Sequence, residues 1–132
     1  MVMRGAEMVL GLGTDLIEIE RIQASMDRFG ERFLERVFTV EEIAYCGRKK
    51  QPAESLAARF AAKEAGAKAP GTGISRGISW KEIEVTRKMG ERPMLHFNGR
   101  AGELAEAMGV RRVQLTLSHS RKLAIAVVVV EN

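Results

Sequence analysis

The nine residues LAIAVVVVE (123–131) are apolar at almost every position. A strand that is apolar on both faces is typical of the centre of a sheet. Only Arg121 and Lys122 separate this segment from the preceding RVQLTLSHS (112–120). This spacing predicts an antiparallel hairpin with a tight turn. Three further strands are expected at residues 8 to about 14, within 79–88 and at 93–97.

Helical spacing accounts for most of the remaining sequence. Apolar residues recur at this spacing from about Ile17, and Gly30 is expected to end or bend that helix. Thr39 and Glu42 have capping-box spacing at the start of a second helix. Two more helices are expected from Pro52 to about Ala69 and from about 100 to 108. The combination predicts an α+β fold with helices packed on one face of an antiparallel sheet.

Length and composition limit the class of protein. The 132 residues suggest a single domain over 1–132. Cys46 is the only cysteine, which excludes an internal disulfide and favours a reducing cytosol, and no apolar run is long enough to cross a bilayer as a helix. The net charge of +4 suits a polyanionic partner, whereas an aromatic content of 5% argues against stacking on single-stranded nucleic acid.

The stretch RFAAKEAGAK (59–68) places a carboxylate on the apolar face of a helix. A step of four residues leads from Phe60 to Glu64 and then to Lys68. Because an unpaired buried carboxylate is costly, Glu64 needs a base or a metal ion nearby. A local ion pair with Arg59 or Lys63 is one interpretation.

A second interpretation of Glu64 involves Asp15. It follows GLGT (11–14), where a buried strand is expected to turn into a helix, and it could simply cap that helix. Two carboxylates without histidine or cysteine nearby also suit Mg²⁺. Lys63, Lys68 and the backbone amides of GTG (71–73) could then hold phosphate charge beside the metal. This pattern indicates phosphoryl-type chemistry at a pyrophosphate.

Two other segments admit both a structural and a functional interpretation. His119 lies between Ser118 and Ser120 and could serve as a structural hydrogen-bonding residue or contact phosphate or ribose. A basic row near the first helix could be a solvated face with ion pairs. Alternatively, it could dock an acidic helical partner, with Phe29 and Phe33 as apolar anchors. The arginines of this row are Arg21, Arg28, Arg32 and Arg36.

Three segments closely resemble the holo-[acyl-carrier-protein] synthases, the 4′-phosphopantetheinyl transferases of the bacterial type. They are GLGTDLIEIERI (11–22), ESLAARFAAKEAGAKAPGTGI (54–74) and LTLSHSRKLAIAVVVV (115–130). The resemblance extends from about Met8 to Glu131 and implies the 4′-phosphopantetheinyl transferase fold. It also implies that a carrier-protein serine attacks the β-phosphate of coenzyme A. The 4′-phosphopantetheine arm would move to the serine, adenosine 3′,5′-bisphosphate would leave, and the product would support fatty acid biosynthesis.

The same resemblance implies roles for individual residues. Asp15 and Glu64 would hold Mg²⁺, with Lys68 as a third catalytic residue, and Glu64 or a metal-bound water would take the serine proton. The segments that contact coenzyme A would contribute Lys63, Lys68, Gly71, Thr72, Gly73, Ser118, His119 and Ser120. The acyl carrier protein would dock on Arg21, Arg28, Arg32 and Phe33. The implied assembly is a cytoplasmic homotrimer with sites at subunit interfaces, without nucleic-acid or membrane partners.

Two other functions are compatible with the sequence. A metal-dependent hydrolase of nucleotides or phosphodiesters would need the same carboxylates and lysines. A non-enzymatic basic module that binds nucleic acid would not depend on Glu64 and would lose affinity steeply with salt.

Overall fold

The computed structural model describes residues 8–71, 73–74 and 77–132. Thr72, which is predicted to contact coenzyme A, lies outside the described residues. The elements in chain order are β1 (Val9–Glu18), α1 (Ile19–Phe29), α2 (Glu31–Val37), α3 (Val40–Gly47), α4 (Pro52–Lys68), the 3₁₀ helix η1 (Trp80–Glu82), β2 (Ile83–Thr86), β3 (Met94–Phe97), α5 (Gly99–Met108), β4 (Arg112–His119) and β5 (Leu123–Glu131).

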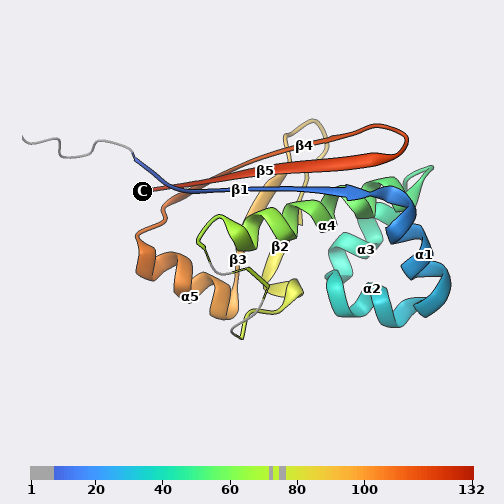
Figure 1. The fold of residues 1–132 in the computed structure, drawn as a ribbon, viewed down its shortest axis with the longest axis horizontal. Coiled ribbons are helices and arrows are strands. Elements are labelled where there is room, and N and C mark those ends of the chain that lie inside the picture. The colour runs from blue at the N-terminus through green and yellow to red at the C-terminus, as the bar shows by residue number, and fades with distance from the viewer. Residues whose placement is uncertain (1–7, 72, 75–76) are drawn as a thin grey trace, which may run out of the picture.

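The strands form two antiparallel sheets. The larger sheet has the order β1-β5-β4, and β2 pairs with β3 in a separate sheet. Figure 1 shows α4 along one face of the larger sheet, with α1, α2 and α3 at one end of the molecule and α5 at the other. The central position of β5 and the α+β arrangement with helices on one face of the sheet confirm the sequence predictions.

Small residues let α4 lie close to the larger sheet. The helix faces the sheet with alanines that are fully buried, and β5 contributes small or branched side chains to the same layer. The buried residues of this layer include Ala57, Ala61, Ala62, Ala65, Ala124, Ala126, Val128 and Val130. Close packing of this kind is sensitive to single added methyl groups.

The glycines of GLG bring β1 against the backbone of α4. A Cβ atom on Gly11 would lie 1.9 Å from the carbonyl oxygen of Ala69, and one on Gly13 would lie 2.0 Å from that of Ala65. No residue with a side chain can occupy these positions without moving the strand or the helix. The two glycines therefore set the distance between β1 and α4.

Gly66 has a similar role on another side of α4. A Cβ atom there would lie 3.0 Å from Cδ1 of Leu95 and 3.1 Å from Cγ2 of Ile83. Its weak helix propensity is thus accompanied by close packing against β2 and β3.

The predicted end of the first strand is wrong. Asp15 does not cap a helix, because β1 continues to Glu18 and pairs Asp15 with Ala126 of β5. Helix α1 begins at Ile19, whose backbone N–H donates to the carbonyl of Lys122 at 2.8 Å. The long partner strand extends β1 beyond the boundary that local sequence indicated.

Other local predictions are confirmed. Thr39 and Glu42 form both hydrogen bonds of a capping box at the start of α3. Helix α4 spans the expected range, and Gly109 follows α5 in the left-handed conformation. Within the described ranges, no helix is long and apolar enough to span a membrane.

Candidate active site

Asp15, Glu64 and Lys68 come together where β1 crosses the C-terminal part of α4. The Lys68 ammonium lies 3.0 Å from Oδ1 of Asp15 and donates to the carbonyl of Thr14 at 3.3 Å. Glu64 precedes Lys68 by about one helical turn and is partly buried. The site thus joins residues from two elements that are far apart in sequence.

The charge state of Glu64 reflects this environment. Burial raises the pKa of Glu64, the negative charge of Asp15 raises it further, and Lys68 opposes both effects. The two carboxylates are therefore close enough to interact, and a cation between them would relieve their repulsion. Neither Arg59 nor Lys63 forms an ion pair with Glu64 in the described part of the chain, so the simpler interpretation of Glu64 is wrong.

The donor set at this site suits a hard cation. Its two carboxylates supply oxygen ligands, which Mg²⁺ prefers, and Mg²⁺ commonly takes only one or two carboxylates from the protein. Across residues 8–71, 73–74 and 77–132, no group of three or more histidine, cysteine, aspartate or glutamate side chains is arranged to hold a metal ion. Any Mg²⁺ held here would complete its coordination with water or substrate oxygens.

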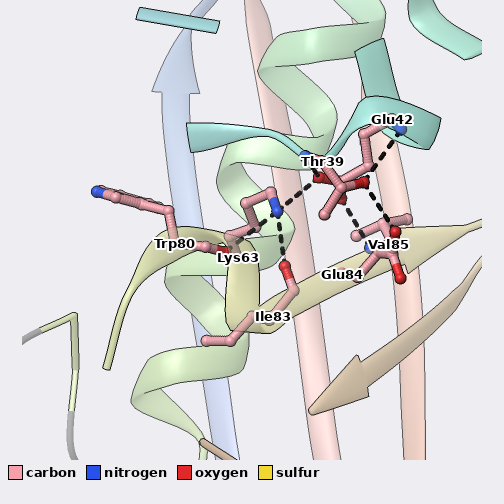
Figure 2. Close-up of polar contacts among 7 residues, drawn as sticks. All are labelled: Thr39, Glu42, Lys63, Trp80, Ile83, Glu84 and Val85. Atoms are coloured by element: carbon pink, nitrogen blue, oxygen red, sulfur yellow. Dashed lines mark hydrogen bonds and ion pairs between the residues drawn. The ribbon is translucent and has the colours of Figure 1, made fainter. Parts of the chain in front are cut away.

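Lys63 does not lie beside Lys68 as the phosphate prediction requires. Its side chain is fully buried, and its ammonium lies 2.7 Å from Oε1 of Glu42. It also donates to the carbonyls of Ile83 at 2.6 Å and Trp80 at 3.2 Å. Figure 2 shows this ammonium directed toward α3 and β2, so in this structure it is not exposed to a phosphate.

The glycine-rich loop also differs from expectation. The N–H of Gly71 donates to the carbonyl of Lys68 at 2.8 Å, and the N–H of Gly73 donates to that of Ala67 at 2.9 Å. Both glycines have positive φ, at 88° and 71°, which explains the residue type. These two amides therefore end α4 and do not point freely toward a phosphate.

The three polar residues near the hairpin turn after β4 have different environments. Ser120 Oγ accepts hydrogen bonds from the backbone N–H groups of Lys122 and Leu123, both at 3.2 Å. Ser118 is exposed opposite Ile125. His119 is exposed and lines a cavity of about 580 Å³ against α4.

This cavity is basic and was not predicted from the sequence. Arg59 is 4% exposed, its guanidinium carbon lies 4.2 Å from the ring centre of Tyr45, and its Nη1 donates to Ser55 Oγ at 3.2 Å. Its buried Nε has no hydrogen-bond partner among the described residues. The full lining is Tyr45, Lys49, Lys50, Gln51, Glu54, Ser55, Ala58, Arg59, Arg87, Leu117 and His119.

The electrostatics of the cavity favour an anion. Burial raises the pKa of Tyr45, but Lys49 and Arg59 outweigh this effect and leave the pKa below its ordinary value. The Lys49 ammonium lies 4.5 Å from the Tyr45 ring centre. A buried arginine with an unused donor suits a phosphate. The available sequence signal was the spacing of four residues between Ser55 and Arg59. Eight of the eleven lining residues lie within 45–59, but the other three come from β4 and the segment that follows β2.

The predicted docking arginines are exposed on α1 and α2, on the same helices as the exposed acidic residues Glu20, Asp27, Glu31 and Glu35. Arg21, Arg28 and Arg32 are exposed and make no ion pair in the part of the chain that the structure describes. The guanidinium of Arg28 lies 5.1 Å from the ring centre of Phe29. Phe33 is half-buried and packs edge-on against Phe38. The three arginines are therefore available to a partner without breaking an ion pair among the described residues.

The outer face of the larger sheet exposes apolar side chains on β1 and β5. Leu12 and Leu16 of β1 are 63% and 58% exposed, and Leu123 and Ile125 of β5 are 40% and 39% exposed. These side chains lie opposite the face that α4 covers. An exposed patch of this kind is typical of an interface.

The chain is similar to proteins of one family over nearly its whole length. Residues 11–128 match the family model described as the 4′-phosphopantetheinyl transferase superfamily. A holo-[acyl-carrier-protein] synthase of Koribacter versatilis is 47% identical over 125 residues, which cover 95% of this chain and 100% of the relative.

Solved structures agree with the sequence comparison. The crystal structure of a holo-[acyl-carrier-protein] synthase from Neisseria meningitidis has a TM-score of 0.85 and 36% identity, covering 95% of this chain and 100% of that chain. The Helicobacter pylori enzyme of the same name, in complex with coenzyme A, has a TM-score of 0.79 and 33% identity, covering 90% and 98%.

Proposed function

This chain belongs to the 4′-phosphopantetheinyl transferase superfamily, and we propose that it transfers 4′-phosphopantetheine from coenzyme A to a serine of apo acyl carrier protein. The products are holo acyl carrier protein, which serves fatty acid biosynthesis, and adenosine 3′,5′-bisphosphate. The observation that carries the proposal is the meeting of Asp15, Glu64 and Lys68 at the crossing of β1 and α4.

The site suits attack on a pyrophosphate. The serine oxygen forms a bond to the β-phosphorus, and the bond from that phosphorus to the bridging oxygen breaks, so the bridging oxygen leaves on adenosine 3′,5′-bisphosphate. Asp15 and Glu64 would hold Mg²⁺, which supplies positive charge to the pyrophosphate oxygens when bound. Lys68 places a further positive charge beside Asp15. The serine proton passes to Glu64 or to a water hydrogen-bonded to it.

The basic cavity is the proposed site for an anionic end of coenzyme A. His119 reaches it from β4, and Arg59 reaches it from α4 with a buried Nε that has no hydrogen-bond partner in the described ranges. A phosphate would supply the missing acceptor and would be charge-assisted by Lys49 and Arg87.

The proposed assembly is a homotrimer with shared active sites, and the positions of the two anion sites support the sharing of a site between copies. Arg59 and Glu64 are five residues apart on α4, which separates them by about 140° around the helix axis. One coenzyme A molecule that reaches both the basic cavity and the site with Glu64 is therefore best accommodated between two copies of the chain. The open face with Leu12, Leu16 and Ile125 is the proposed contact between copies.

The exposed arginines of α1 and α2 are the proposed docking site for the acidic carrier protein. Arg21, Arg28 and Arg32 have no competing ion pairs among the described residues, and exposed Phe29 adds apolar area. We place the reaction in the cytoplasm, since the single cysteine, Cys46, is a free buried thiol.

A transfer assay tests this function. The chain is incubated with coenzyme A, Mg²⁺ and an apo acyl carrier protein, and the mass of the carrier is measured. Addition of the phosphopantetheine mass is expected, and Asp15→Ala should abolish it while leaving the fold intact. Cleavage of coenzyme A without mass gain on the carrier would indicate a hydrolase, and normal transfer by Asp15→Ala would contradict the site.

A further inference from the structure

Lys63 and Glu42 form an ion pair inside the protein, and both side chains are fully buried. The ammonium of Lys63 has three N–H donors, and three acceptors surround it. These acceptors are Oε1 of Glu42 at 2.7 Å, the carbonyl of Ile83 at 2.6 Å and the carbonyl of Trp80 at 3.2 Å. The hydrogen-bonding capacity of the ammonium is thus fully used.

The Glu42 carboxylate is equally well satisfied. Its Oε1 also accepts from the backbone N–H of Thr39 at 2.8 Å, and its Oε2 accepts from the backbone N–H of Val85 at 2.8 Å. Figure 2 shows how the pair connects the first turn of α3, the middle of α4 and strand β2. Thr39 extends this network, because its hydroxyl donates to Glu84 at 2.7 Å.

The directions of Lys63 and Glu64 are linked by helix geometry. Successive residues of an α-helix are about 100° apart around its axis. With Lys63 held toward α3 and β2, the next residue is directed away from them, toward the side of α4 where Asp15 and Lys68 lie. On that side Gly13 lies against the backbone of α4, so the helix is fixed from two directions.

A phosphate-binding role for Lys63 conflicts with this arrangement. The ammonium would have to leave three acceptors and abandon a fully buried carboxylate. An unpaired buried charge is strongly unfavourable. Buried ion pairs often add little net stability compared with apolar residues, but their directional bonds can specify one arrangement of the chain.

We infer that Lys63 and Glu42 are positioning residues, which set the rotation of α4 and thereby the place of Glu64 beside Asp15, and that Lys63 does not contact coenzyme A. The inference rests on the proposed function, since it concerns the geometry of the proposed site. It replaces a phosphate role for the lysine that precedes Glu64.

The first test uses the unaltered protein with ¹⁵N-labelled lysine side chains. A buried ammonium with three acceptors exchanges its protons slowly enough to be observed by nuclear magnetic resonance. Coenzyme A is added, and the ammonium resonance of Lys63 is followed together with the side-chain Nζ resonance of Lys68, which is detected through its non-exchanging Hε protons because the exposed Lys68 ammonium exchanges its own protons too quickly. Lys68 is expected to shift, and Lys63 is expected to remain in place with its bond to Glu42 intact. A Lys63 shift as large as that of Lys68 would overturn the inference.

The second test compares Glu42→Gln and Lys63→Met, with Lys68→Met as the matched control. The first two variants should each lower kcat about tenfold or more, while the KM for coenzyme A changes less than about twofold. Their combination should be no slower than the slower single variant, because both remove the same interaction. Lys68→Met should raise the KM for coenzyme A, since Lys68 lies in the site.

The outcomes separate three explanations. A large rise in the KM for coenzyme A with Lys63→Met but not with Glu42→Gln would show that Lys63 contacts the substrate. Normal kcat in both folded variants would show that the pair only stabilises the fold. Either of these two results would overturn the inference. If Lys63→Met does not fold, the resonance experiment and Glu42→Gln decide. A failure of the proposed function is distinguishable, because the unaltered protein would then add no mass to the carrier.

Discussion

Replacing Gly13 with alanine tests whether the distance between β1 and α4 controls the site. The new Cβ atom would lie 2.0 Å from the carbonyl oxygen of Ala65 and 2.8 Å from the backbone nitrogen of Ala69. Since real Cβ contacts essentially never fall below 3.0 Å, strand and helix must separate by about 1 Å, the difference between 3.0 and 2.0 Å. The atoms that obstruct the methyl group are backbone, so no side-chain rotation can relieve the contact.

That displacement has two expected effects. Overpacking of this kind costs about 1–3 kcal/mol of the free energy of unfolding. Asp15 lies two residues beyond Gly13, so its contact with Lys68 would lengthen from 3.0 Å beyond hydrogen-bonding distance. A misplacement of about 1 Å can reduce turnover on the order of 100-fold. We therefore expect lower stability together with a loss of kcat.

The assay combines thermal unfolding with steady-state transfer, measured well below the melting temperature of the variant. Gly47→Ala is the matched control, because a Cβ atom on Gly47 meets nothing within 4 Å and Gly47 ends α3 in a helical conformation. This control should keep the wild-type kcat. Wild-type stability and turnover in Gly13→Ala would refute the packing argument, and reduced stability with unchanged kcat would refute its connection to the site.

The remaining predictions concern charge. Folding raises the pKa of Glu64, so at pH values just above the ordinary pKa of a glutamate the folded state binds more protons than the unfolded state. The free energy of unfolding therefore falls as the pH rises from the ordinary pKa through the raised one. Acidification from pH 7 toward about 4 should therefore stabilise the wild type relative to Glu64→Gln in chemical denaturation, and an equal response of both would contradict the shift. Arg59→Met should raise the KM for coenzyme A about tenfold or more and leave the KM for the carrier unchanged. An equal rise in both KM values would show that the cavity is not part of the coenzyme A site. Arg28→Glu should raise the KM for the carrier, most strongly at low salt, whereas Arg100→Glu on α5 should not. Similar carrier KM values for the two variants would show that the carrier does not dock on α1 and α2.

Local structure was largely predictable because it depends on residues close in sequence. The capping box of Thr39 and Glu42, the range of α4 and the hairpin after β4 all follow from spacing, turn residues and apolar periodicity. The end of β1 was not predictable in the same way. Its extension beyond Asp15 depends on pairing with β5, more than 100 residues away.

The candidate site shows the same division. The unusual positions of Asp15 and Glu64 in the sequence were enough to nominate a pair of carboxylates. The direction of Lys63 depends on Glu42, and the hydrogen bonds of Gly71 and Gly73 depend on how α4 ends. The basic cavity could not be predicted, because Tyr45, Arg59, Arg87 and His119 come from separate elements.

The type and range of most helices and strands thus follow from the order of amino acids, since helix and strand periodicity are properties of short segments. Which charged group serves the site is a matter of tertiary structure, because it depends on the partner that each group meets. Lys63 and Lys68 lie five residues apart on one helix, but one is buried against Glu42 and the other is exposed beside Asp15. The physical reason is the 100° turn per residue of α4, combined with the close approach of Gly13 that brings Asp15 to only one side of that helix.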